Sequence, residues 1–438
     1  MLKTVRNAFK VEDIRKRLLY TLLMLVVVRF GSQLPTPGVD PTFIQNFFAQ
    51  QTGDAFNFFD AFTGGSFTSM SLFALGITPY ITSSIIVQLL TIAIPKLEEM
   101  QKDGEDGRKK IQTISRYLTV ALALIESIAM TVGFGSRGLL AANTIPNKIV
   151  VIAAMTAGSA FLMWIGEEIT EHGVGNGISI VLLINIVSRI PDDFVTLFDQ
   201  FMKGQTILNA VVAAVVIIAV VLVTVVFVIF LQDGERRIPV QYAKKMQGRK
   251  MGGGQSTNIP LKVNTAGVIP VIFASSLMSF PNVIASLLGK TGGTGIGSKI
   301  MTGLSQSSWC DPSRPIYSLG LVLYIVLVVF FAYFYTSITF NPIEISNNMK
   351  RQGGFIPGIR PGKPTTEYLS RILNYIVFIG AVGLIIVCVI PIFFNGMFGA
   401  NVSFGGTSII IIVGVVLETL KQIESQMLVR YYKGFLND

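Results

Sequence analysis

Few side chains in this chain of 438 residues could do covalent or metal chemistry. Its only histidine is His172, and its two cysteines, Cys310 and Cys388, stand in a polar stretch and an apolar run. A structural zinc site needs about four such ligands, and a His-dependent triad needs a partnered nucleophile. The sequence also lacks the GxxxxGK[ST] phosphate loop of many ATPases. It therefore predicts no catalytic residues, no metal site and no cofactor.

A carboxylate within an apolar membrane segment is costly and often functional, and two acidic residues are candidates for such a role. Glu126 lies well inside one segment and Glu418 toward the end of another. A proton relay through a buried glutamate would indicate a secondary transporter for a small solute. A membrane insertase or scaffold without an aqueous pore is a second alternative, and both stay open at this point.

The elements that carry these residues are hydrophobic segments of membrane-spanning length. The chain is 51% hydrophobic and 14% charged, whereas soluble domains carry about a quarter charged residues. No signal-peptide pattern occurs before Arg17, so we expect the protein to be held by its own spans. About 20 apolar residues cross a bilayer core, and ten segments qualify: 18–34, 72–94, 117–135, 149–166, 177–191, 207–231, 265–288, 316–340, 372–394 and 407–427.

Basic residues test this assignment. With ten spans, 27 of the 35 Lys and Arg residues fall on the side of the two termini and 7 on the other. Arg29, inside the first predicted span, is the remaining one. Because Lys and Arg concentrate on the cytoplasmic side of a membrane, we expect a multi-pass protein of the cytoplasmic membrane with both termini in the cytoplasm.

Two cytoplasmic loops are longer and more basic than orientation requires. They cover 232–264 and 341–371 and hold seven and five basic residues. The first mixes Lys and Arg with Gln, Tyr and a glycine run, which favours a projecting hairpin. Such loops suit an acidic partner, whether protein or RNA, while anionic lipid accounts for many single basic residues.

Two spans open with a related phrase. Residues 76–81 read GITPYI and residues 267–272 read GVIPVI, and each phrase is followed by a Ser-Ser pair at 83–84 and 275–276. The offset of five spans predicts two halves that are inverted relative to each other in the membrane. Inverted repeats place a passage or binding site at the interface of the halves, so we expect both helices to line it.

The outer stretch between Pro35 and Leu72 is unusual. It is rich in Gly, Ser and Phe and has no basic residue. It is too short to span together with its flanks, and it lies directly before the second span. We expect a re-entrant segment, which must be buried in protein or line a cavity.

These features together resemble the SecY family, the channel subunits of the bacterial protein translocase, over nearly the full length. The bacterial type is indicated by short outer loops and tails. The matching stretches are RFGSQLPTPGVD (29–40), SLFALGITPYITSSIIVQLLT (71–91), DGEDGRKKIQTISRYLTV (103–120), EHGVGNGISI (171–180), QSTNIPLKVNTAGVIPVIFASSLMSFP (255–281) and FNPIEISNNMKRQGGFIPGIRPGKPT (340–365).

The resemblance implies an all-α membrane protein with ten transmembrane helices. They would form two inverted, pseudo-symmetric five-helix halves, 1–195 and 196–438, with a re-entrant plug helix at about 56–73. It implies a protein-conducting channel that translocates unfolded secretory polypeptides. Membrane segments would leave laterally between the second and seventh spans.

The resemblance also implies site residues. A constriction at mid-membrane would be formed by Ile81, Ile85, Ile178, Leu182, Ile272 and Ile411. The plug would include Phe62, Gly64, Gly65, Ser66 and Phe67. Many relatives carry an arginine where this chain has Ser69, so that plug contact is not expected here. Arg29, at the outer end of its span, would snorkel or pair with Asp60.

The implied partners are proteins, clients and lipid. Arg360, between Pro357 and Pro361, would present its guanidinium at a stiff loop tip to the SecA motor ATPase or the ribosome. A second docking patch would comprise Lys244, Lys245, Arg249 and Lys250. The remaining partners would be the small SecE and SecG subunits, signal peptides and preproteins, and anionic lipid.

Overall fold

The computed structural model is mostly helical. It describes residues 9–40, 42, 60, 62–201, 207–242, 246–247, 250–251, 256–287, 296–305, 308–310, 315–398 and 406–434. The N-terminal half of the chain holds α2 (Glu12–Gly31), α5 (Thr78–Ala93), α6 (Pro95–Lys102), α7 (Glu105–Phe134), the π-helix η1 (Gly135–Leu139), α8 (Ile145–His172) and α9 (Gly177–Phe201).

In the C-terminal half, the described residues form seven α-helices and one 3-10 helix. They are α10 (Ile207–Asp233), α11 (Ile269–Leu287), α12 (Ile296–Leu304), the 3-10 helix η3 (Pro315–Ser318) with α13 (Leu319–Thr339), α14 (Pro342–Arg351), α15 (Lys363–Phe398) and α16 (Gly406–Gly434).

Each of the ten predicted spans coincides with a helix, but not every helix is apolar and long enough to be counted as spanning. Within the described residues, five helices could cross a membrane by length and composition. A sixth span results if α5 and α6, bent by 107° around Ile94, count as one. The number ten therefore stays a prediction. The helix at the fifth predicted span, α9, is longer than the predicted range 177–191, because it continues through Pro191 to Phe201.

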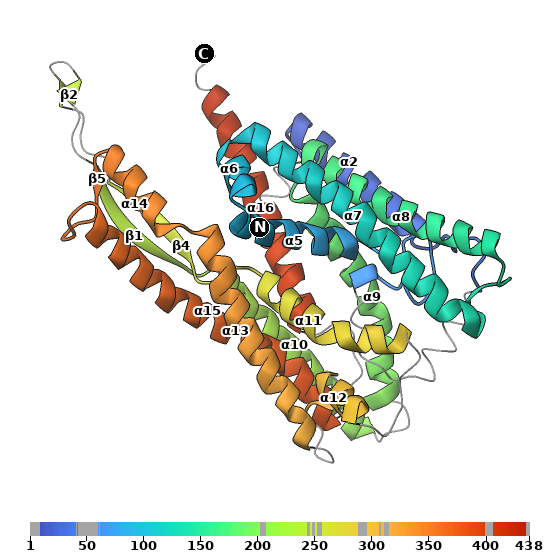
Figure 1. Cartoon of the computed structure of the whole chain (residues 1–438). Coiled ribbons are helices and arrows are strands. Elements are labelled where there is room, and N and C mark those ends of the chain that lie inside the picture. Colours follow the sequence, from blue (N-terminus) through green and yellow to red (C-terminus); the bar gives the residue numbers. More distant parts are fainter. Residues whose placement is uncertain are drawn as a thin grey trace.

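The helices form two groups that meet along a central layer. In Figure 1, α2, α7 and α8 lie on one side of the molecule and α10, α13 and α15 on the other. Helices α5, α9, α11 and α16 lie between them. Helix α16 packs against both α9 and α10, and α11 reaches α7. Residues that line a passage between the groups must therefore come from these central helices.

The predicted repeat is visible in local geometry. Gly76 and Gly267 both have left-handed backbone angles, with φ of +60° and +64°, which glycine adopts without a Cβ penalty. Helices α5 and α11 begin two residues later. Pro79 and Pro270 are the second residues of these helices and so remove no intrahelical hydrogen bond. The prolines start the two helices and do not break them.

The first serine of each Ser-Ser pair ties its helix to the next span. Ser83 is fully buried, and its Oγ donates to the Ser115 carbonyl of α7 at 2.6 Å. Ser275 is 1% exposed, and its Oγ lies 3.4 Å from the Tyr324 hydroxyl of α13. Each half thus has a polar contact at the equivalent position, which attaches α5 to α7 and α11 to α13.

The two basic loops fold into one small sheet at one end of the molecule (Figure 1). Strand β1 (Glu235–Tyr242) pairs antiparallel with β4 (Ser256–Lys262), which confirms a hairpin, and with β5 (Gly354–Phe355) from the other loop. Ile238 and Val240 alternate inward and pack on Met349 of α14. The tip carries β2 (Met246–Gln247) and β3 (Lys250–Met251), and Figure 1 shows it projecting from the body.

Candidate functional site

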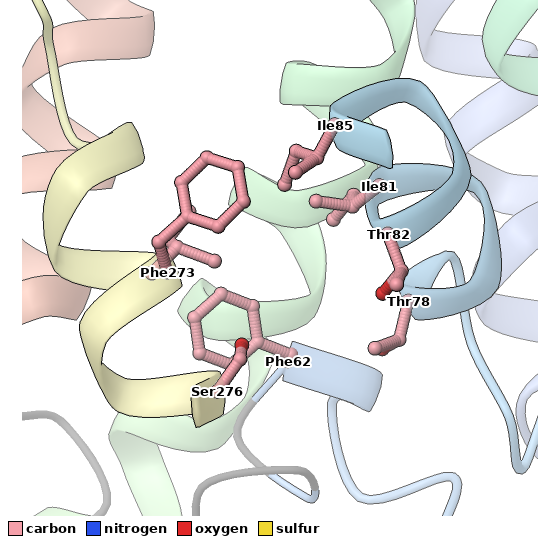
Figure 2. A pocket seen from close by; sticks show the side chains of 8 residues that line it. Phe62, Thr78, Ile81, Thr82, Ile85, Phe273 and Ser276 are labelled. Carbon is pink, nitrogen blue, oxygen red and sulfur yellow. The ribbon is translucent and has the colours of Figure 1, made fainter. Parts of the chain in front are cut away.

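A cavity lies between the central helices of the two groups. It encloses about 470 Å³, open mouth included, and is mostly apolar. Figure 2 shows side chains of α5 on one side facing those of α11 on the other, with Phe62 between their ends. The lining residues are Phe62, Thr78, Ile81, Thr82, Ile85, Ile272, Phe273 and Ser276.

Of the six aliphatic residues predicted to form a constriction, Ile81, Ile85 and Ile272 line this cavity. Ile178, Leu182 and Ile411 do not line it but belong to a hydrophobic cluster with Ile81, Ile272 and Phe62. Four helices contribute the six residues, so no local sequence pattern alone could have placed them together. Leu182 and Ile411 are 7% and 2% exposed. Three others are partly buried in the same hydrophobic cluster, which also contains Phe62: Ile81, Ile178 and Ile272. Ile85 lines the cavity one helical turn beyond Ile81.

Other lining residues escaped the sequence reasoning. Thr78 and Thr82 share a face of α5 with Ile81 and Ile85, because positions i, i+3, i+4 and i+7 align on a helix. That periodicity could have identified them. Phe273 could not be found in this way, since its ring is set by stacking on Phe331 of α13, with centroids 5.1 Å apart.

The predicted plug segment, residues 56–73, lies beneath the cavity and is only partly helical. Residues 56–59 and 61 fall outside the described residues. Helical geometry is seen at 60 and 62–63, and turns follow from Gly64 onward. The prediction of a plug helix that reaches Phe73 was therefore wrong. Gly64 and Gly65 have φ of +66° and +85°, values that favour turns over helix.

The described plug segment is nevertheless buried among the helices. Phe62, Ser66 and Phe67 are 6%, 1% and 7% exposed. A bridge between Pro35 and Ser71 holds the end of the segment, with the Thr36 amide donating to the Met70 carbonyl at 2.9 Å. On its other side, α8 packs so closely that a Cβ on Gly158 would lie 2.0 Å from the Leu72 carbonyl oxygen.

Asp60 pairs with a different arginine from the one predicted. Its carboxylate lies 3.0 Å from Arg189 of α9. Arg29 instead donates from Nη1 to the Gly64 carbonyl at 3.2 Å. Arg29 does reach the plug segment, but as a backbone hydrogen-bond donor, so the predicted Arg29–Asp60 pair was wrong. Asn185, one turn before Arg189, donates to the Phe62 carbonyl at 3.1 Å.

The predicted docking residues are partly described. Arg360 is exposed at a loop tip between Gly358 and Gly362, whose φ values are +82° and +103°. The tip is pinned because Thr365 Oγ1 donates to the Arg360 carbonyl at 2.9 Å and Ser346 Oγ to the Gly362 carbonyl at 3.0 Å. In the second patch, Lys250 lies in β3, while Lys244, Lys245 and Arg249 lie outside the described residues.

This arrangement offers space and apolar surface but no reacting group. No ionisable side chain lines the cavity among the described residues, and neither Glu126 nor Glu418 reaches it. Apolar walls of this kind disfavour ions while accepting varied side chains through dispersion contacts. Two groups of helices enclose this apolar cavity, and a buried chain segment lies beneath it. This arrangement defines the class of gated α-helical membrane channels.

Comparisons with known proteins identify the family. The SecY family model matches residues 71–420. A protein translocase subunit SecY of Streptomyces scabiei is 44% identical over 451 residues, covering all of both chains. The corresponding subunit of Halalkalibacterium halodurans is 42% identical over 447 residues, again covering all of both chains. The chain belongs to the SecY family.

Solved structures agree with this fold. A structure described as a protein-conducting channel has a TM-score of 0.62 at 20% identity and covers 94% of this chain and 92% of its own. Sec61 in the canine ribosome–channel complex from the endoplasmic reticulum gives the same TM-score, identity and coverage. At such identity the likeness establishes the fold alone.

Proposed function

We propose that this chain forms the protein-conducting channel of a bacterial translocase. Unfolded secretory polypeptides cross the membrane through the space between the two helix groups. Membrane segments leave sideways into lipid between α5 and α11. One observation carries this proposal: in a member of the SecY family, Ile81, Ile85 and Ile272 line an uncharged cavity at the junction of the groups, and aliphatic residues of α9 and α16 share a hydrophobic cluster with its lining residues.

The proposed constriction consists of Ile81, Ile85, Ile178, Leu182, Ile272 and Ile411. Branched side chains can pack around a passing chain of any sequence, because dispersion contacts need no specific partner. In the absence of a client, the same side chains disfavour water and ions. Phe62 supports a plug role for residues 56–73, because its side chain lines the cavity between the ends of α5 and α11 (Figure 2).

The halves 1–195 and 196–438 form the two sides of this channel. Their membrane is the cytoplasmic membrane, and both termini face the cytoplasm. The split of 27 against 7 basic residues supports this orientation. The matching φ values of Gly76 and Gly267 support the inverted repeat.

The channel works with partners, since it has no phosphate loop with which to bind and hydrolyse ATP. SecA or a translating ribosome docks on the exposed Arg360 tip and on the β2–β3 hairpin with Lys244, Lys245, Arg249 and Lys250. SecE and SecG subunits complete the complex. Signal peptides and preproteins are the clients, and anionic lipid surrounds the basic cytoplasmic side. No cofactor is required.

A stalled client provides the direct test. Single cysteines replace Ile81 or Ile272, with Cys310 and Cys388 changed to serine, and a secretory chain carrying a photoreactive probe is arrested during transport. Both positions should cross-link to the client. Leu222 of α10 and Val326 of α13, which are 60% and 57% exposed on outward faces, serve as lipid-facing controls. Cross-linking at the controls but not at Ile81 or Ile272 would contradict the proposal.

Two further measurements address the alternatives. Deleting 56–73 should make reconstituted channels conduct ions, whereas a poreless insertase would stay silent. A Glu126→Gln variant should export normally, whereas a transporter that relays protons through this residue would lose activity.

A further inference from the structure

The plug segment is attached to α9 by a buried polar cluster. Asp60 is 1% exposed, and one carboxylate oxygen lies 3.0 Å from Arg189 Nη2. The other oxygen accepts from the Thr68 amide and hydroxyl, both at 3.0 Å. Asn185, 2% exposed on the same face of α9, donates to the Phe62 carbonyl. Asn185 and Arg189, one turn apart on α9, therefore bind Phe62 and Asp60 of the plug segment.

The glycines of the plug make this close approach possible. A Cβ on Gly64 would lie 2.9 Å from the Asn185 backbone, and one on Gly65 would lie 3.5 Å from Arg189 Nη1. A larger residue at position 64 would push the turn away from α9, because the α9 atoms that it would meet are backbone atoms. The approach thus places a carboxylate and a guanidinium together in an environment of low polarity, where their attraction is stronger than in water.

The cluster is incompletely satisfied. Three buried polar atoms in it lack a partner among the described residues, namely Ser66 Oγ, Asn185 Oδ1 and Arg189 Nε, and a fourth, Asp60 Oδ2, has only its ion pair with Arg189. An unpaired buried polar atom costs free energy that water repays when the group is exposed. A buried ion pair also gives little net stability against its desolvation, although removing one partner is strongly destabilising. These properties suit a contact that must hold and also release.

We propose that Asp60 and Arg189, helped by Asn185, form a charge lock that keeps the plug segment on α9 until a client displaces it. This inference rests on the proposed channel function. Arg189 is a positioning residue, because it acts on the plug and not on the client. When the plug leaves, water satisfies the four atoms, so the lock opens without stranding a buried charge.

The test measures plug position and ion leak in the same reconstituted channels. Asp60→Asn and Arg189→Gln each leave one buried group without its charged partner, so each should raise the ion conductance at least tenfold. The double variant restores a neutral pair and should return conductance toward the parent value. Lys421→Gln with Asp233→Asn removes an exposed pair, 50% and 59% exposed, and should leave conductance unchanged.

A thiol readout separates unlocking from unfolding. Ser66→Cys, in a Cys310→Ser background, reports the plug, while native Cys388, 3% exposed in α15, reports folding. Each single lock variant should label at position 66 at least ten times faster than the parent, with Cys388 silent. Should either variant also expose Cys388, Asn185→Leu replaces it, since it removes one hydrogen bond without burying a charge. It should label about threefold faster.

Unchanged labelling and conductance in the folded variants would overturn the lock. A double variant no better than the worse single variant would do the same, because the two charges would then act independently. The deletion of 56–73 is the reference. If that deletion does not conduct, the channel proposal fails; if it conducts while the single variants stay tight, the lock alone fails.

Discussion

Side chains on α5 and α11 face each other across the cavity. We propose that their polarity determines which polypeptide segments can enter the constriction. Ile272→Ser should widen the range of clients by several-fold, because a hydroxyl weakens the apolar seal that a signal sequence must displace. Export of a reporter with a defective signal sequence measures this. Leu277→Ser, at a position 52% exposed on the same helix, is the matched control. Continued rejection of the defective reporter by Ile272→Ser would contradict the assignment.

Cys310 gives a pH-dependent prediction in the segment between α12 and α13. Burial raises the pKa of its thiol above the ordinary value. A raised pKa means a smaller thiolate fraction at any given pH, and the thiolate is the reacting species. Alkylation of Cys310 should therefore reach half its maximal rate at higher pH than alkylation of a Lys299→Cys thiol, whose position is exposed. Coincident pH profiles would count against the burial effect.

Residue types were easier to predict than residue partners. The aliphatic positions followed from the family motif, and the structure gathers them. The partner of Asp60 did not follow, because Arg29 and Arg189 both lie near the plug and their reach depends on how α2 and α9 pack. The turn at Gly64 turns its carbonyl toward Arg29 and places Asp60 beside Arg189.

At the scale of elements, the Arg360 tip makes a directional prediction. Arg360→Glu should reduce motor-driven export at least tenfold, because a charge-assisted contact becomes a repulsive one. Thr365 and Ser346 bond only the backbone of the tip, so membrane assembly should be unaffected. Export into inverted vesicles with purified motor is the measurement. Arg351→Glu, also exposed, controls for loss of basic charge.

Helix starts were predictable because glycine and proline mark them, as at Gly76 and Gly267. Helix ends were not. Helix α9 continues through Pro191 to Phe201, and the plug segment becomes turns at Gly64, where positive φ lets it approach α9. The pairing of β1 with β5 was also out of reach, since its partners lie more than 100 residues apart and only two residue pairs join them.

At the scale of the whole molecule, basic residues predict orientation. In intact cells with Cys310 and Cys388 changed to serine, a Lys299→Cys thiol should react with a membrane-impermeant maleimide. A Lys350→Cys thiol should react only after the membrane is permeabilised. Both side chains are exposed, so access to the reagent and not burial decides the outcome. The opposite pattern would invert the topology, and labelling of both from outside would break the ten-span assignment.

The three-stranded sheet has a mechanical consequence. Because Gln241 and Tyr242 pair with Phe355 and Gly354, we expect the two basic loops to move as one unit, which packs on α15 through Ile238 and Val240. A displacement of either loop should therefore be transmitted to α15. Genetic suppressors of a defect in one loop should accordingly arise in the other, even though neither touches the constriction.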